Sequence, residues 1–339
     1  MSDQFLRRDR KWREAEEAER LAPAATHAAD SEGRAEPEEP DEFRTVFERD
    51  RDRILHSKAF RRLKHKTQVF LNPAGDHFVT RLTHTVQVAQ VARSLAAGLG
   101  LNGDLAEAIA LGHDVGHTPF GHTGEEALSP YVDGGWHHAG QSVRIFTVLE
   151  DRNLTAEVVD GIRAHSWRID PPPSTLEGDV VRFADRIAYL THDALDAMRA
   201  GVLAPSDFPD AARACLGTPG SDWIGRMIHA VLDESPRAGR VTMEADVLEV
   251  MRELRDFMFT RVYEAGDNER KKHSAITIIR QLVDWHLEHP DDLPETYRDT
   301  EADLTTQVLD YVAGMTDRYA LAVHDDLFRP VLPVGLLLS

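Results

Sequence analysis

The side chains best suited to catalysis are concentrated in residues 113–125. This segment holds three histidines and two carboxylates, namely His113, Asp114, His117, His122 and Glu125. Three glycines and a proline are interspersed among them, so the segment cannot form the interior of a regular helix. Histidine and carboxylate groups together can bind a divalent metal ion, and they can also transfer protons near neutral pH. Residues 113–125 are therefore the candidate active site.

Two polar side chains elsewhere lie in apolar surroundings. His84 has apolar residues two positions to either side, where a histidine is more often a satisfied core residue than a ligand. Asp185 follows an apolar stretch, and a carboxylate is costly to bury unless it is paired or bound to a metal. An ion pair with Arg182 or Arg186 would explain Asp185 equally well, so these residues alone leave both interpretations open.

The elements that must position these groups are mainly helical. The composition is rich in Ala, Leu, Glu and Arg, which favours helix, and apolar residues recur at helical spacing. We predict helices over residues 43–63, 80–99, 104–112, 176–199, 221–232, 243–263, 272–288 and 305–321, with another beginning near Glu125 or His138. Strand signals are weak, and a small hairpin of residues 68–71 with 78–79 is the only candidate.

Composition narrows the class of protein. The 339 residues carry a net charge of −19, from 39 basic against 58 acidic side chains, which argues against an extended nucleic-acid-binding surface. A local basic stretch over residues 49–66, which includes Arg53, could be an exposed helix face or a rim that binds phosphate. The single cysteine favours a reducing compartment. No apolar run approaches the roughly 18 residues of a membrane span, so we expect a cytoplasmic protein without a membrane partner.

In order along the chain, His84, His113-Asp114 and Asp185 resemble the H…HD…D pattern of the HD-domain metallophosphohydrolases. The match is closer to one group, the bacterial dGTPase-like deoxynucleoside triphosphate (dNTP) triphosphohydrolases. The similar blocks are residues 49–57, 59–63, 66–70, 81–84, 113–125, 184–193 and 310–319. A lone His-Asp pair is weak evidence, and this chain has others, but ordered blocks from about residue 21 to 330 are specific.

This resemblance implies a mainly α fold, namely an HD-domain helical bundle with a C-terminal helical extension and at most a small β-hairpin. Residues 1–40, which are rich in Ala, Glu and Pro after residue 21, are expected to be a flexible lead. Residues 41–200 would then form the metal-binding and catalytic core, and residues 201–339 a C-terminal helical region.

The reaction implied by the resemblance is metal-dependent hydrolysis of dGTP or several dNTPs to deoxynucleoside and inorganic triphosphate. One divalent ion, Mn, Mg, Fe or Zn, would be held by His84, His113, Asp114 and Asp185. The catalytic residues would be His117, His122 and Glu125, with Glu125 orienting His122. Residues on the substrate side would be Arg53, Gln68, Arg81, His138, Arg186, Tyr189 and Asp193.

Within that last set, Arg81 and Arg186 would neutralise the triphosphate. Tyr189 would stack on the sugar, and Asp193 would accept a hydrogen bond from the 3′-OH. The family usually has Asn on both sides of the position of His138, whereas this chain has His137 and Ala139. This chain therefore departs from the family pattern on both sides of His138.

Members of the family commonly form homo-oligomers, often tetramers or hexamers, and some respond to a nucleotide or single-stranded DNA effector. The resemblance implies the same here. It leaves open another HD phosphohydrolase activity, either a 5′-nucleotidase or a guanosine-polyphosphate hydrolase, and also a non-catalytic nucleotide or single-stranded DNA sensor. A further alternative is a zinc peptidase, because residues 113–117 resemble H-E-x-x-H. That motif requires both histidines on one helix, which Gly116 and Pro119 oppose.

Overall fold

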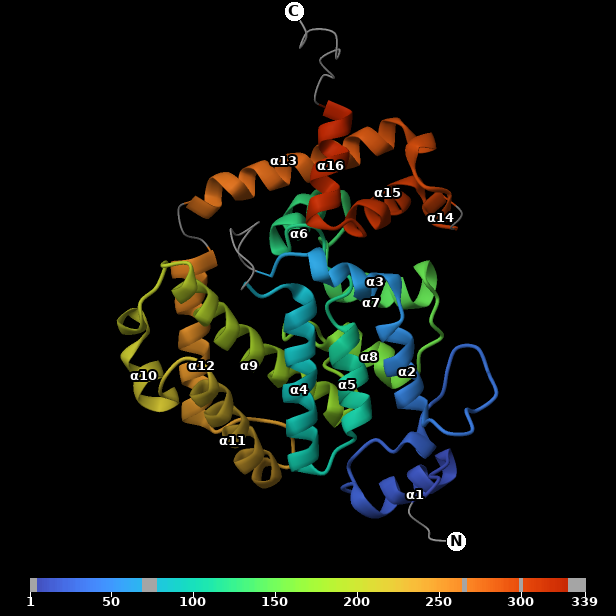
Figure 1. The fold of residues 1–339 in the computed structure, drawn as a ribbon, viewed down its shortest axis with the longest axis vertical. Helices are drawn as coiled ribbons and strands as arrows, with labels where there is room; N and C mark the ends of the chain where they lie inside the picture. Colours follow the sequence, from blue (N-terminus) through green and yellow to red (C-terminus); the bar gives the residue numbers. More distant parts are fainter. Residues whose placement is uncertain (1–4, 69–77, 264–266, 299–300, 329–339) are drawn as a thin grey trace, which may run out of the picture.

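The computed structural model describes residues 5–68, 78–263, 267–298 and 301–328. Within these ranges the regular elements are all helical and no strand is present, so the predicted mainly α fold is confirmed (Figure 1). The first nine α-helices are α1 (Arg10–Arg20), α2 (Val46–Leu55), α3 (Lys58–Arg62), α4 (Arg81–Leu99), α5 (Gly103–Gly112), α6 (His122–Leu128), α7 (His138–Arg144), α8 (Ala156–Ala164) and α9 (Leu176–Arg199). The others are α10 (Asp210–Leu216), α11 (Ser221–Ala238), α12 (Ala245–Met258), α13 (Asp267–Glu288), α14 (Glu295–Arg298), α15 (Leu304–Ala313) and α16 (Asp317–Phe328).

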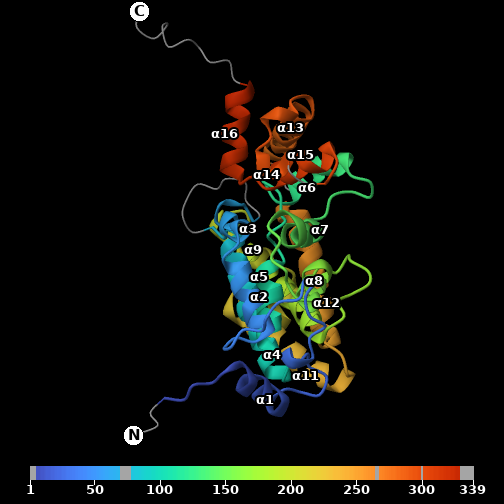
Figure 2. The same ribbon diagram turned by 90° about the vertical axis from the view of Figure 1, so that its right-hand side faces the viewer.

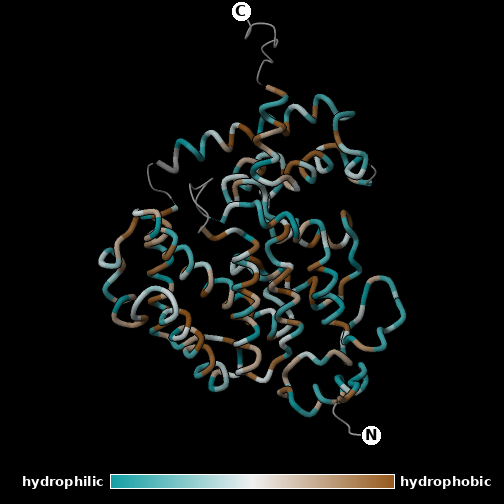
Figure 3. The backbone as a smooth tube through the Cα atoms, in the orientation of Figure 1, coloured by the Kyte–Doolittle hydropathy of each residue, from teal (hydrophilic) through white to brown (hydrophobic). Residues whose placement is uncertain are grey.

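The larger of two hydrophobic clusters is built around α4, α5 and α9. Helices α4 and α9 pack on each other and on α5, and α2 and α8 cover α5. The apolar side chains of these helices are buried in one continuous cluster, which extends through α11 and α12 to Val262. The helices alternate hydrophobic and hydrophilic residues along their length, as expected for elements with one buried face (Figure 3).

A second hydrophobic cluster lies at the C-terminal end. It joins α13, α15 and α16 to Phe120 and to Ala127 and Leu128 of α6. Figures 1 and 2 both show α6 beside the C-terminal helices. The larger cluster continues beyond residue 200 to Val262, and the C-terminal cluster combines Phe120 and α6 with helices after residue 263. Composition cannot reveal this division, because α10 to α12 and α13 to α16 are equally helical.

The N-terminal segment differs from the expected flexible lead. Residues 10–20 form α1, and Leu21, Ala25 and Ala28 are buried against the larger cluster. The carboxylate of Glu17 accepts a hydrogen bond from the Ala28 amide at 2.8 Å, and Arg34 pairs with the buried Asp50. These two polar contacts and the burial of Leu21, Ala25 and Ala28 hold the segment in place, although its composition is typical of a disordered chain.

Several predicted elements end differently in the structure. The helix expected over residues 43–63 is divided into α2 and α3, and the one expected over residues 221–232 continues to Ala238 as α11. The expected helix over residues 305–321 is interrupted between α15 and α16, where a Cβ on Gly314 would lie 2.8 Å from the Tyr297 hydroxyl. The expected hairpin falls largely on residues outside the described ranges, and only an isolated bridge between Thr67 and Thr80 is seen. None of the described helices combines the length and the apolar character that crossing a bilayer requires.

Candidate active site

Two histidines and two carboxylates converge where α4, α5 and α9 meet. His84 lies in the first turn of α4, Asp185 in α9, and His113 and Asp114 directly follow α5. The Nε2 atom of His84 is 3.1 Å from Asp185 Oδ1. The Nε2 atom of His113 is 3.3 Å from Asp114 Oδ1 and 3.8 Å from Asp185 Oδ1. The structure therefore brings together all four residues expected to bind a metal.

The end of α5 at Gly112 makes this convergence possible. Adjacent residues on a regular helix point about 100° apart, so His113 and Asp114 can face one point only beyond the helix end. The same ending means that His113 and His117 do not share one helix. The peptidase alternative required that arrangement, and the structure therefore opposes it.

The geometry at His113 fits a bound cation. Its Nδ1 donates to the carbonyl of Ala110 at 2.6 Å, so Nε2 is the ring nitrogen available to a metal ion. This Nε2 is buried, has no hydrogen-bond partner within the described part of the chain, and faces carboxylate oxygens. Such a group of acceptors is unfavourable without a positive charge among them. His84, His113 and Asp185 place their ligand atoms within 4.8 Å of one another, so these residues fit a divalent metal ion.

Both carboxylates are held in the ionised form that metal ligation requires. Arg81 Nη1 donates to Asp114 Oδ2 at 2.8 Å, and His117 Nε2 lies 3.2 Å from Oδ1. Burial opposes ionisation of Asp114, but the charges of His113, His117 and Arg81 keep the pKa of this carboxyl well below its usual range. Burial likewise opposes ionisation of Asp185, and the neighbouring histidines lower its pKa in spite of it.

Glu125, in the first turn of α6, is surrounded by three imidazole rings. Its carboxylate oxygens lie 2.9 Å from His117 Nδ1, 3.0 Å from His122 Nδ1 and 2.7 Å from His138 Nδ1. Burial opposes ionisation, but the charges of His138 and His117 hold the pKa of Glu125 well below its usual range. The side chain of His122 is 73% exposed, whereas those of His117 and His138 are buried, so His122 is the member of this group that external molecules can reach.

His165, which no sequence pattern indicated, joins the two groups. Its Nδ1 donates to the carbonyl of Ile162 at 2.7 Å, and its Nε2 lies 3.0 Å from His138 Nε2. Its ring packs edge-on against His113, and the ring of His138 stacks on that of His117. Burial lowers the pKa of His165 to about 4. One local feature of the sequence could have indicated His165, because it directly follows the end of a helix, as His113 does.

Residues expected on the substrate side line α9 beyond Asp185. Tyr189 and Asp193 follow at four-residue intervals and therefore share its face. The guanidinium of Arg186 lies 3.9 Å from the centroid of the Trp167 ring, which fixes its direction. Burial raises the pKa of Tyr189 to about 12, so its hydroxyl is a donor at neutral pH.

Asp193 is held by a tyrosine that sequence reasoning missed. The Tyr263 hydroxyl donates to Asp193 Oδ2 at 2.5 Å, from the π-helical turn that follows α12. Burial raises the pKa of Asp193 to about 7, so near neutral pH this side chain is close to half protonated. Tyr263 is 70 residues away in sequence, and nothing in its own neighbourhood indicated this contact.

Gln68 and Arg53, which were also expected on the substrate side, do not lie along α9 with the others. The carbonyl of Gln68 lies beside Gly121, and its side-chain Oε1 is buried without a partner in the described ranges. Arg53 is not brought to the cluster. Its guanidinium donates to the carbonyls of Arg152 and Asn153 at 3.0 and 2.8 Å and pairs with Glu38 at 2.6 Å. These three acceptors, none of them in the cluster, take three of the five guanidinium N–H donors.

Gly116 lets the segment of residues 113–125 pass close to α7. A Cβ at this position would lie 2.3 Å from the Ser142 amide nitrogen and 2.4 Å from the His138 carbonyl oxygen. We therefore expect Gly116→Ala to lower the free energy of unfolding by about 1–3 kcal/mol, because backbone atoms cannot easily move aside. Urea denaturation measures this. Gly140→Ala, in α7 with nothing within 4 Å, is the control and should be neutral or slightly stabilising. Equal stability of the two variants would contradict the close packing.

Comparison with protein-family models identifies two matches. The model described as "HD domain" matches residues 81–190, the span that contains the four converging metal-ligand candidates. The model described as "Phosphohydrolase-associated domain" matches residues 241–326, which include the C-terminal helices α13 to α15. The two matches together cover more than half of the chain.

Comparison with curated proteins identifies relatives along almost the whole chain. A deoxyguanosinetriphosphate triphosphohydrolase-like protein of Caldanaerobacter subterraneus subsp. tengcongensis is 48% identical over 316 residues, covering 91% of this chain and 93% of that protein. Proteins with the same name from Desulfatibacillum aliphaticivorans and Clostridium tetani are 44% and 40% identical. They match 94% and 93% of this chain and 97% and 94% of their own length.

Proposed function

The chain belongs to the HD-domain phosphohydrolases of the deoxyguanosinetriphosphate triphosphohydrolase-like family, and on that premise we propose that it hydrolyses dNTPs to deoxynucleoside and inorganic triphosphate. One observation carries the proposal. A metal-type set of two histidines and two carboxylates lies directly beside a carboxylate that holds three imidazole rings. Such a site combines electrostatic stabilisation of a phosphate with proton transfer to a leaving group.

His84, His113, Asp114 and Asp185 would hold one divalent metal ion, which would polarise the α-phosphate and offset its developing charge. The donor set of two imidazoles and two carboxylates suits Mn²⁺, Fe²⁺, Mg²⁺ or Zn²⁺. Arg81 orients Asp114 through their 2.8 Å hydrogen bond, and it adds positive charge beside the phosphates. Arg186, held against Trp167, would contribute the same on the α9 side.

The proton-transfer half consists of Glu125 and its histidines. In the proposed reaction a water oxygen bonds to the α-phosphorus, the bond from phosphorus to the 5′-oxygen breaks, and a proton goes to the 5′-oxygen. His122 is the exposed ring of the group, and Glu125 orients it through the hydrogen bond at Nδ1, so its Nε2 would deliver that proton. The buried His117 lies between Asp114 and Glu125 and would sit beside the attacking water.

Selection of a deoxyribose would involve the far end of α9. The ring of Tyr189 would pack on the sugar and leave no space for a 2′-OH. Asp193, fixed by Tyr263, would hydrogen-bond the 3′-OH. On this basis we expect dGTP to be hydrolysed faster than GTP.

Product analysis tests the proposal. The purified chain, incubated with dGTP and Mn²⁺ or Mg²⁺, should release deoxyguanosine and inorganic triphosphate, and a chelator should stop the reaction. In ¹⁸O-labelled water the label should enter the triphosphate and not the deoxynucleoside, because the bond to the 5′-oxygen breaks on the phosphorus side. Release of orthophosphate from dGMP would instead indicate a 5′-nucleotidase. Tight nucleotide binding without turnover would contradict an enzyme and favour a sensor.

A further inference from the structure

The two halves of the candidate site belong to different hydrophobic clusters. The metal half lies on α4, α5 and α9 in the larger cluster, whereas Glu125 lies on α6, which packs against the C-terminal cluster. Only the turn of residues 118–121 joins the two halves directly along the chain. The position of Glu125 relative to the metal half therefore depends on how this turn is held, as well as on the contacts of Glu125 with His117 and His138.

The turn adopts a backbone conformation that needs external support. Phe120 has a φ of 62° and Gly121 a φ of 59°, and a non-glycine residue such as Phe120 rarely occupies this region. Inside the turn, the Thr118 hydroxyl donates to the Gly121 carbonyl at 2.8 Å. The Phe120 amide points away from these contacts, to a residue almost 200 positions further along the chain.

That residue is Asp317, the first residue of α16. Its Oδ1 accepts from the Phe120 amide at 3.0 Å. Its Oδ2 accepts from the Thr67 amide at 3.0 Å and also from the Thr67 hydroxyl. The side chain is 8% exposed, and the positive end of the α16 dipole favours its charge. The Asp317 carboxylate therefore connects the turn of residues 118–121 to the segment around Thr67 and to the C-terminal helices.

Lys66 makes a parallel link next to it. Its side chain is 1% exposed, and its ammonium nitrogen donates to the carbonyl of His117 and, at 3.0 Å, to the carbonyl of Ala313 at the end of α15. The segment of Lys66 and Thr67, the segment of residues 117–121 and the C-terminal helices are thus connected twice, once through His117 and once through Phe120.

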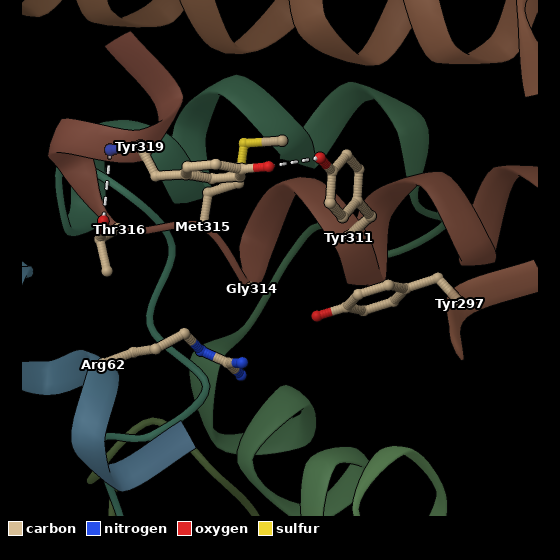
Figure 4. Close-up of a pocket in the computed structure, with 7 residues that line it drawn as sticks. All are labelled: Arg62, Tyr297, Tyr311, Gly314, Met315, Thr316 and Tyr319. Carbon is tan, nitrogen blue, oxygen red and sulfur yellow. Dashed lines mark hydrogen bonds between the residues drawn. The ribbon is translucent and has the colours of Figure 1, made fainter. Parts of the chain in front are cut away.

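On one side of these polar contacts of Lys66 and Asp317, the interface is not filled by packed side chains. There the connection from α15 to α16 borders a pocket instead of a filled interface (Figure 4). Gly314 and Thr316, which closely precede Asp317, lie across this pocket from Arg62 of α3, whereas the Met315 side chain points into the C-terminal cluster. Polar contacts at Lys66 and Asp317 therefore add to the apolar packing of Phe120 in holding the C-terminal helices on the turn of residues 118–121.

We propose that Asp317 is a positioning residue for the hydrolysis proposed above, setting the place of Glu125 relative to the metal half through the Phe120 amide. The inference rests on the proposed function for its kinetic consequence. Asp317 touches neither the metal-ligand candidates nor Glu125, so it would act on the catalytic step and not on metal binding.

Asp317→Asn tests this with almost no change of volume. An amide has one accepting oxygen, so in either orientation its NH₂ group faces the amide of Phe120 or of Thr67. We expect kcat to fall about tenfold to a hundredfold, because small displacements of catalytic groups have effects of that size. KM and metal content should stay within about twofold of wild type. The control is Asp303→Asn, an exposed aspartate that caps α15 in the same C-terminal region and should leave kcat unchanged.

Hydrogen exchange of residues 115–128 gives a readout that does not depend on turnover. Exchange there should be faster in Asp317→Asn than in wild type or Asp303→Asn. Thr67→Val, which removes only the hydroxyl donor to Asp317, should show smaller changes in the same direction and serves if Asp317→Asn does not fold. An unchanged kcat, loss of metal, or a rise in KM without a fall in kcat would overturn the inference. If wild-type protein releases no triphosphate, the proposed function fails. The positioning role is then rejected only if hydrogen exchange of residues 115–128 is the same in Asp317→Asn as in wild type.

Discussion

Replacing Glu125 with glutamine is expected to lower the kcat of dNTP hydrolysis by about a thousandfold while metal content stays constant. Glu125 accepts hydrogen bonds from His122 and His138 and lies 2.9 Å from His117 Nδ1. A carboxamide offers one accepting oxygen and one NH₂ group, so it cannot serve three ring nitrogens. It also removes the negative charge that stabilises an imidazolium. His122 would then be neither oriented nor able to hold the proton for the leaving group.

Steady-state kinetics together with metal analysis of the purified variant measure this effect. Glu126→Gln is the matched control, since Glu126 is the next residue of α6 and pairs at the surface with Lys272 at 2.8 Å. That variant should keep wild-type kcat. Full turnover by Glu125→Gln would show that proton transfer resides elsewhere. Loss of metal from Glu125→Gln would show that metal binding and proton transfer are not separate functions of the two halves of the site.

Asp185→Asn is expected to remove metal binding and hydrolysis together. Asp185 Oδ1 lies 3.1 Å from His84 Nε2 and 3.8 Å from His113 Nε2, and the amide group would replace a charged ligand by a neutral one. Substitution of groups that merely support metal ligands lowers affinity about 10- to 100-fold, so loss of a direct ligand should lower it at least about 100-fold. Dialysis followed by elemental analysis measures the metal directly.

A second readout for Asp185→Asn does not require activity. Metal at about a hundred times its dissociation constant should stabilise wild-type protein by about 2.7 kcal/mol, and it should not stabilise the variant. The control is Asp179→Asn, on the same helix, where the carboxylate pairs with Arg182 at 3.4 Å. Metal-dependent stabilisation of Asp185→Asn equal to that of wild type would remove Asp185 from the ligand set.

Sequence reasoning was most successful where local pattern and chemistry agree. Helix α9 has the predicted bounds of 176–199, and the apolar neighbours of Asp185 correctly indicated a partly buried position next to other polar groups. The break after Gly112 was predicted from glycine spacing, and it is what lets His113 and Asp114 face one point. The roles of these residues remain predictions that the experiments above test.

Contacts between distant segments account for what was missed. Lys66 was grouped with exposed basic residues, because its sequence neighbours are basic, yet it is buried between two carbonyls. Tyr263 and His165 have partners 70 and 27 residues away, at Asp193 and His138. Composition gave the N-terminal segment the character of a disordered chain, whereas its contacts with the rest of the fold, such as Arg34 with Asp50, hold it in place. None of these pairings leaves a periodic signal in one sequence.

The attachment of α6 to the C-terminal cluster affects how variation in such chains should be interpreted. A substitution between α13 and α15 that only loosens apolar contacts would shift α6, and it would then behave like a mutation of the active site itself. A diverging gene copy could keep every histidine and aspartate of the HD pattern and still lose its chemistry through drift in the helices after residue 267. An intact motif is therefore insufficient evidence that a relative is an enzyme. The apolar residues that support α6 must be compared as well.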